Sequence, residues 1–149
     1  MDSVNGESAM NDLNQSDIEK TCKQLFDEFR GILSWKWDDW VGTILAEFSA
    51  DKKEDIRAIL EKFFPASWDS SNIDTAPQIV QTLDERLGGI RPTQLLFTTH
   101  PDHNAFVFCA WWPWGSQMTI SLRIAIFDKN LSKAEESKLI EQLKVWAQI

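Results

Sequence analysis

The residues of this chain best suited to a binding task are its indole rings. Eight tryptophans occur in 149 residues, and three of them fall in one stretch, Trp111-Trp112-Pro113-Trp114-Gly115. If a strand runs through Trp112, the adjacent Trp111 and Trp112 point to opposite faces of a sheet, so at most one of the two lines a helix-covered core. Exposed tryptophan is enriched in binding hot spots because it buries a large rigid surface and offers one N–H donor. We therefore expect Trp111, Trp112 and Trp114 to bind a partner; the alternative is that the rings pack under the helices or against Trp68.

A second indole group, Trp35-Lys36-Trp37-Asp38-Asp39-Trp40, lies further upstream. Trp35 beside Asp38 and Asp39 predicts a mixed aromatic and acidic patch that suits a partner rich in lysine or arginine. The alternative for the two aspartates is that they complement the dipole at the start of a helix. Adjacent side chains on a helix diverge, so paired acid–base catalysis by Asp38 and Asp39 is not expected.

The groups that usually carry enzymatic chemistry are sparse. The two histidines bracket Asp102 in a turn, but no third histidine or nearby cysteine completes a zinc site. Cys22 and Cys109 lie in apolar patterns without a basic neighbour to form a thiolate, which predicts free buried thiols. Nucleophile-elbow, P-loop and dinucleotide-binding motifs are missing, and the chain has no tyrosine. We expect no metal and no cofactor, and favour a non-enzymatic role.

One alternative is a small-ligand pocket, or a modest enzyme built on one. Curvature of a short sheet beneath helices would leave an apolar cavity lined by Phe97, Phe106, Phe108 and Trp112. Arg123 would then bind a carboxylate or phosphate of the ligand. The competing interpretation makes Arg123 a solvent-facing strand residue.

Charge and composition narrow the class of partner. The net charge is −8, which disfavours nucleic acid and anionic membrane surfaces, and no apolar run is long enough to span a bilayer. Acidity favours a basic protein partner, although it also serves solubility alone. We expect residues 1–15 to form a disordered acidic tail, and they lack the features of a secretory signal. We expect residues 16–149 to form a single domain. A cytoplasmic location is the default expectation.

Apolar spacing of three and four residues predicts five helices. The first covers residues 17–33 behind the capping box of Ser16 and Glu19. Helices are also expected over residues 37–48, from Asp51 to a stop at Pro65, and from Thr75 to Gly88-Gly89, with a loop over 65–75. The last follows a capping box of Ser132 and Glu135, with Leu139, Ile140, Leu143 and Trp146 as its buried stripe.

Between the last two helices the period changes from 3.6 to 2. Strands are predicted over residues 94–100, 105–112 and 117–127, and the middle one is apolar on both faces, so it should be central. The predicted fold is α+β: four N-terminal helices, a three-stranded antiparallel meander and a C-terminal helix, with the helices packed on the sheet.

Taken together, these patterns predict a non-enzymatic, intracellular protein-binding module that presents an aromatic hairpin and an acidic face. By size and charge alone it is comparable to immunity or antitoxin proteins, or to secretion chaperones. No oligomeric state is predicted.

Overall fold

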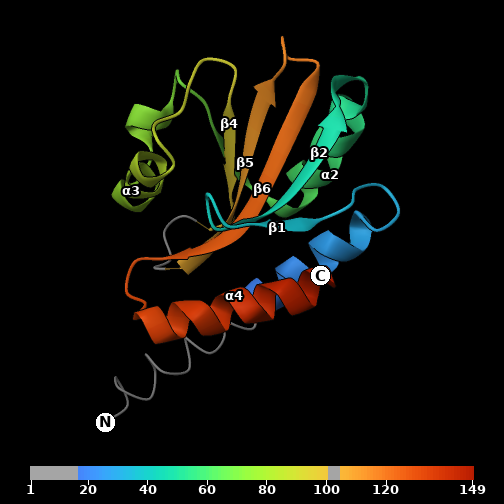
Figure 1. Ribbon diagram of the computed structural model, residues 1–149. Helices are drawn as coiled ribbons and strands as arrows, with labels where there is room; N and C mark the ends of the chain where they lie inside the picture. Colours follow the sequence, from blue (N-terminus) through green and yellow to red (C-terminus); the bar gives the residue numbers. More distant parts are fainter. Residues whose placement is uncertain (1–16, 101–104) are drawn as a thin grey trace.

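The structure is a computed structural model that describes residues 17–100 and 105–149 (Figure 1). Six strands in these residues form one antiparallel sheet, in the order β1-β2-β6-β5-β4-β3. The strands are β1 (Lys36–Asp38), β2 (Thr43–Ser49), β3 (Ala66–Trp68), β4 (Leu95–Thr98), β5 (Ala105–Trp114) and β6 (Thr119–Asp128). The helices are an N-terminal helix over residues 17–28, α2 (Lys53–Phe63), α3 (Gln78–Arg86) and α4 (Lys133–Ala147), with 3-10 turns η1 (Ala50–Lys52) and η2 (Ile73–Thr75).

The predicted fold class is wrong, because the sheet has six strands instead of three. The helix predicted over residues 37–48 is instead the hairpin of β1 and β2, and β2 pairs with β6 from Ile44↔Ile124 to Ser49↔Thr119. Residues 43–46 of β2 are buried on both faces, and Ile44, Leu45 and Phe48 also satisfy a helical spacing. The predicted loop over residues 65–75 likewise contains β3 and η2.

The strands predicted in the second half are present. β4, β5 and β6 are consecutive antiparallel neighbours, and β5 pairs with β6 from Ala105↔Asp128 to Trp114↔Thr119. Residues 106–111 of β5 are buried without interruption, which confirms that this strand is central and covered on both sides.

Local signals fix the ends of the helices. The predicted capping box of α4 is confirmed: the Ser132 hydroxyl accepts from the Glu135 N–H at 3.2 Å, and the Glu135 carboxylate accepts from the Ser132 N–H at 3.1 Å. The N-terminal helix ends at residue 28, five residues before the predicted end, and its apolar residues Ile18, Cys22, Leu25 and Phe26 are buried.

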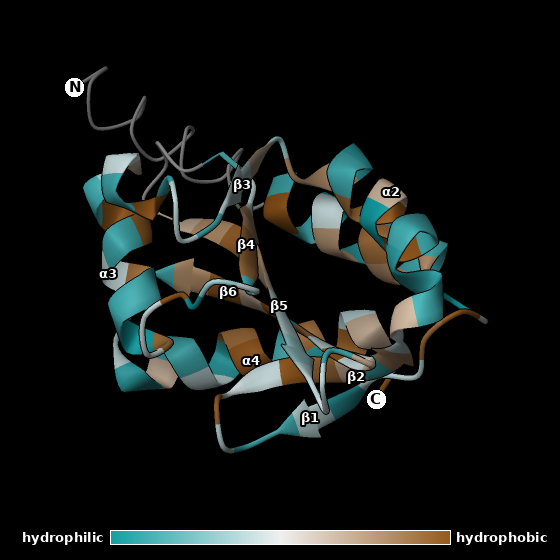
Figure 2. Ribbon diagram, turned by 90° about the horizontal axis from the view of Figure 1, so that it is seen from above, coloured by the Kyte–Doolittle hydropathy of each residue, from teal (hydrophilic) through white to brown (hydrophobic). Residues whose placement is uncertain are grey.

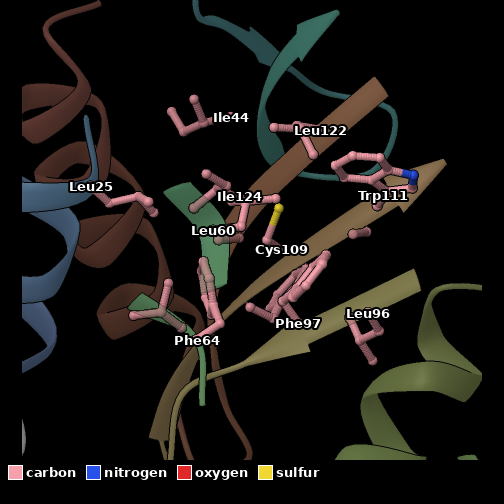
Figure 3. Close-up of a cluster of buried hydrophobic side chains, with 14 of the residues drawn as sticks. Leu25, Ile44, Leu60, Phe64, Leu96, Phe97, Cys109, Trp111, Leu122 and Ile124 are labelled. Carbon is pink, nitrogen blue, oxygen red and sulfur yellow. The ribbon is translucent and has the colours of Figure 1, made fainter. Parts of the chain in front are cut away.

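The helices cover the two faces of the sheet differently. On one face, the N-terminal helix and α2 pack over Phe97, Cys109, Trp111, Leu122 and Ile124 (Figure 3). On the other face lies α3, where the Arg86 guanidinium sits 5.1 Å from the centre of the Phe127 ring. The helix α4 runs beneath the lower end of the sheet, beside the N-terminal helix (Figure 1). Viewed from above, the layers separate clearly, with α3 and α2 on opposite sides of the strands (Figure 2).

In the described residues no helix combines the length and the apolar character needed to cross a membrane.

Candidate functional site

The end of the β5–β6 hairpin is a turn in an unusual backbone conformation. Gly115, Ser116 and Gln117 follow one another with φ values of 61°, 60° and 66°. The left-handed region costs an ordinary L-residue about 1–2 kcal/mol, which Gly115 avoids but Ser116 and Gln117 do not. The strand pairing of Trp114 with Thr119 and a hydrogen bond from the Ala50 N–H to the Met118 carbonyl at 2.9 Å hold the turn in place. Strained backbone of this kind is concentrated at functional segments.

The three indoles of the hairpin have three different environments. Trp111 is 5% exposed and packs in T-shaped contacts with Phe48 and Phe97, at centroid distances of 5.5 and 6.3 Å (Figure 3). Trp112 faces the other way, as the strand alternation predicts, and is half-buried. Trp114 is 51% exposed. Of the three, Trp114 therefore offers the largest surface to a partner, about half of the residue.

Met118 extends this apolar surface across the turn. It is 66% exposed, although the alternation of β6 predicts it on the core face. The strand begins at Thr119, so Met118 belongs to the turn and is released from that face. We call Trp114, Met118 and the intervening Gly115, Ser116 and Gln117 the hairpin tip.

Beside the hairpin tip lies a hollow of about 410 Å³. Its floor is apolar, with Leu95, Trp111, Pro113 and Ile120. Its wall is the first turn and a half of α2, which supplies Lys53, Glu54 and Arg57. The volume of this hollow is large enough for a large side chain of a docked partner.

On the opposite sheet face, Trp112 is part of a polar cluster with Arg123 and Asp38. The Arg123 guanidinium lies 4.9 Å from the centre of the Trp112 ring and pairs with the Asp38 carboxylate. That carboxylate also accepts from the N–H groups of Trp40 and Val41, both at 3.4 Å. The ion pair therefore ties β1 to β6 across β2, a structural task that occupies Arg123.

The protonation of Asp38 reflects these contacts. Burial by itself raises the pKa of a carboxyl group, but the hydrogen bond and charge of Arg123, with the two backbone N–H groups, outweigh it and lower the pKa of Asp38 below its ordinary value. Asp38 is therefore ionised at neutral pH and already paired.

The predicted patch of Trp35, Asp38 and Asp39 is not brought together. Trp35 packs edge-on against Phe26 and Phe29, at 5.3 and 5.8 Å between centroids. Asp39 is exposed and accepts a hydrogen bond from Trp37 Nε1 at 2.6 Å. Three residues from the same stretch thus have three separate roles.

Sequence reasoning missed Trp40, which is 92% exposed in the turn between β1 and β2. The helix predicted over residues 37–48 hid it, since it lay beside the apolar stripe of that helix. The signal in the sequence that could have indicated a turn is Gly42, two residues later. In the structure Gly42 has a φ of +77°, a conformation that glycine adopts readily.

The alternative ligand pocket is not assembled either. Phe97 pairs with Cys109 and Thr98 with Phe108, so Phe97 lies on the opposite sheet face from Phe106 and Phe108. All three rings are at most 4% exposed, inside the packed core.

Neither cysteine has a reactive setting. Burial raises the pKa of Cys22 to about 12 and also raises the pKa of Cys109, so both thiols stay protonated at neutral pH. Within residues 17–100 and 105–149, no three His, Cys, Asp or Glu side chains group in a way that could hold a metal ion. Asp102 and His103 of the predicted turn lie outside the described residues.

No protein-family model matches the chain, and searches of curated proteins and of solved structures find no significant match. The site must therefore be interpreted from its own geometry.

Proposed function

We propose that the chain is a protein-binding module whose docking element is the hairpin tip. The observation that carries the proposal is that Trp114 and Met118, both more than half exposed, flank a turn held in the left-handed region at three successive residues. A turn that is fixed before binding presents its side chains without a further loss of conformational entropy.

The surface available at Trp114 is enough for a hot spot. A tryptophan side chain offers up to roughly 250 Å². About half of that is exposed here, so its burial is worth about 3 kcal/mol at ~25 cal/mol per Å². Ordering of the side chain on binding offsets about 1 kcal/mol of this gain, which leaves about 2 kcal/mol, the usual threshold of a hot spot.

The hollow beside the tip supports the same proposal, because a side chain of the partner can occupy it while Trp114 and Met118 are covered. The net charge of −8 favours a basic partner by speeding its encounter. An immunity-type or chaperone-type role is one form of this proposal, and it rests on size and charge alone.

The test compares two exposed tryptophans at different ends of the sheet. Chain carrying Trp114→Ala, chain carrying Trp40→Ala and unmodified chain are immobilised and used to capture a partner from a cell extract. We expect the unmodified and Trp40→Ala chains to retain the same protein, and Trp114→Ala to lose it, since about 2 kcal/mol corresponds to roughly 30-fold in affinity.

Thermal unfolding of all three chains shows whether the fold is intact. Retention of the partner by Trp114→Ala, or its equal loss by Trp40→Ala, would contradict docking at the hairpin tip.

A further inference from the structure

A second candidate surface lies at the other end of the hairpin. There the N-terminal helix, α4 and the lower ends of β5 and β6 enclose a hollow of about 640 Å³, larger than the one beside the tip. Its apolar lining includes Ile18, Ile126, Leu131, Leu139 and Trp146. We call this hollow the basal groove.

The basal groove exists because the apolar stripe of α4 is incompletely covered. Of the four residues predicted as its buried stripe, Leu143 is buried, whereas Leu139, Ile140 and Trp146 are only half-buried. Ile126 of β6 is half-buried beside them. Partly covered large apolar side chains gathered in one concave place mark a surface that gains free energy when a partner covers it.

The rim of the basal groove is acidic. Glu19, Asp128 and Glu135 line it, against Lys138 as the one base among its described residues. The Glu135 carboxylate is held in the capping box, where hydrogen bonds from the backbone and side chain of Ser132 lower its pKa, so it keeps its negative charge. Glu19 is also paired with Lys23 at 3.4 Å, so the described rim residues together with this partner have an excess of one negative charge.

This charge decides between the available occupants. Residues 1–16 carry Asp2, Glu7 and Asp12 but no lysine or arginine, so the rim repels them. A second copy of the chain brings a net charge of −8 and is also repelled. An amphipathic helix with lysine or arginine beside its apolar stripe can bury that stripe in the groove and pair its basic side chains with the acidic rim.

We propose that the basal groove docks a basic amphipathic helix of a partner protein. This surface is separate from the hairpin tip, because Ala105 lines the groove at the first residue of β5 and Trp114 is its last. The nine steps from Ala105 to Trp114 span about 30 Å, so the two surfaces do not overlap and either proposal can fail without the other.

The probe is a fluorescein-labelled synthetic peptide of about 14 residues, made of leucine and lysine with leucine at helical spacing. A second peptide has the same leucines and glutamate in place of lysine. Fluorescence anisotropy with the full chain measures both affinities. We expect the leucine–lysine peptide to bind at least about tenfold more tightly, and to weaken as salt is raised from about 0.05 to 0.5 M.

Two variants on one helix test the apolar floor. Leu139→Gln should weaken binding of the leucine–lysine peptide about tenfold, because it removes apolar surface from the groove. Val145→Gln is the matched control, since Val145 is exposed on α4 and outside the groove, and it should leave the affinity unchanged. Equal effects of the two variants, or none from Leu139→Gln, would overturn the proposal.

Charge variants test the rim without touching the core. The double variant Glu19→Gln, Asp128→Asn should weaken binding and flatten its dependence on salt. Trp114→Ala should leave the peptide affinity unchanged, which separates this proposal from docking at the hairpin tip. Preference for the leucine–glutamate peptide would refute the charge argument.

Two further outcomes would show that the basal groove has an occupant other than a partner helix. If sedimentation shows a dimer that Leu139→Gln dissociates, a second copy fills the groove. If exchanging Met10 and Leu13 for glutamine raises the affinity for the leucine–lysine peptide, the first residues of the chain fill it. Either result overturns docking of a basic partner helix.

Discussion

Replacing Trp111 with alanine should destabilise the fold far more than replacing Trp114, although the two residues lie on the same strand. Trp111 is 5% exposed, so folding removes nearly its whole side-chain surface from water. At up to roughly 250 Å² and ~25 cal/mol per Å², that burial is worth at most about 6 kcal/mol. The expected loss in the free energy of unfolding is smaller, about 3–5 kcal/mol, because the unfolded chain already buries part of the ring and alanine keeps one methyl group. This is the usual range for such core truncations.

Trp114 provides the contrast. Half of its ring is already in water and it lies at the end of its strand, so Trp114→Ala should cost less than about 1 kcal/mol. Trp40→Ala, at a residue that is 92% exposed, should cost about 0.5 kcal/mol or less.

Urea unfolding followed by far-ultraviolet circular dichroism measures these free energies without using tryptophan fluorescence, which the substitutions themselves change. For a chain of this length, a loss of about 4 kcal/mol also lowers Tm by roughly 10 °C. The reasoning fails if Trp114→Ala costs as much as Trp111→Ala, because Trp114 would then be a core residue and not a free docking surface.

Three further predictions concern the ion pair, the turn and the thiols. Because the folded pKa of Asp38 is lowered, the stability that its ion pair contributes is present above the unfolded pKa and is lost as pH falls through the folded pKa. In urea unfolding at several pH values, Asp38→Asn should therefore cost about 1–2 kcal/mol at neutral pH and progressively less in acid. Gln117→Gly should raise the free energy of unfolding by about 0.5–1 kcal/mol, because glycine adopts a positive φ without strain. The control Gln142→Gly, within α4, should lower the free energy of unfolding by about 1 kcal/mol. A lower free energy of unfolding for Gln117→Gly would refute the strain at this residue. Cys22 and Cys109 should resist iodoacetamide at about pH 8 in the folded chain and react once it is unfolded, and mass spectrometry showing labelled folded chain would contradict their burial.

The candidate site was only partly predictable. Strand alternation correctly separates Trp111 from Trp112, because adjacent side chains on a strand must point to opposite faces. It does not say which face the helices cover more completely. That Trp111 rather than Trp112 is the core residue follows from its contacts with Phe48 and Phe97, which come from two other strands.

Arg123 illustrates the same limit. Its position in β6 was predicted, but its pairing with Asp38 joins residues 85 apart in the sequence. The sequence places Asp38 in a helix, where it would have no access to β6. Once residues 36–49 form a hairpin on the edge of the sheet, Asp38 and Arg123 meet across β2.

The sequence by itself determines the features that depend on neighbours within one or two turns of chain. Ser132 and Glu135 form the capping box of α4 through hydrogen bonds three residues apart, and the all-apolar run of β5 identifies a buried central strand. Only the tertiary structure decides the state of residues 43–49, whose apolar pattern fits a helix and a strand equally well. Residues 44–49 pair with β6, 70 to 80 residues away, and a pairing at that distance leaves no local trace in the sequence, whereas the pairing with β1 across the turn at Gly42 is local.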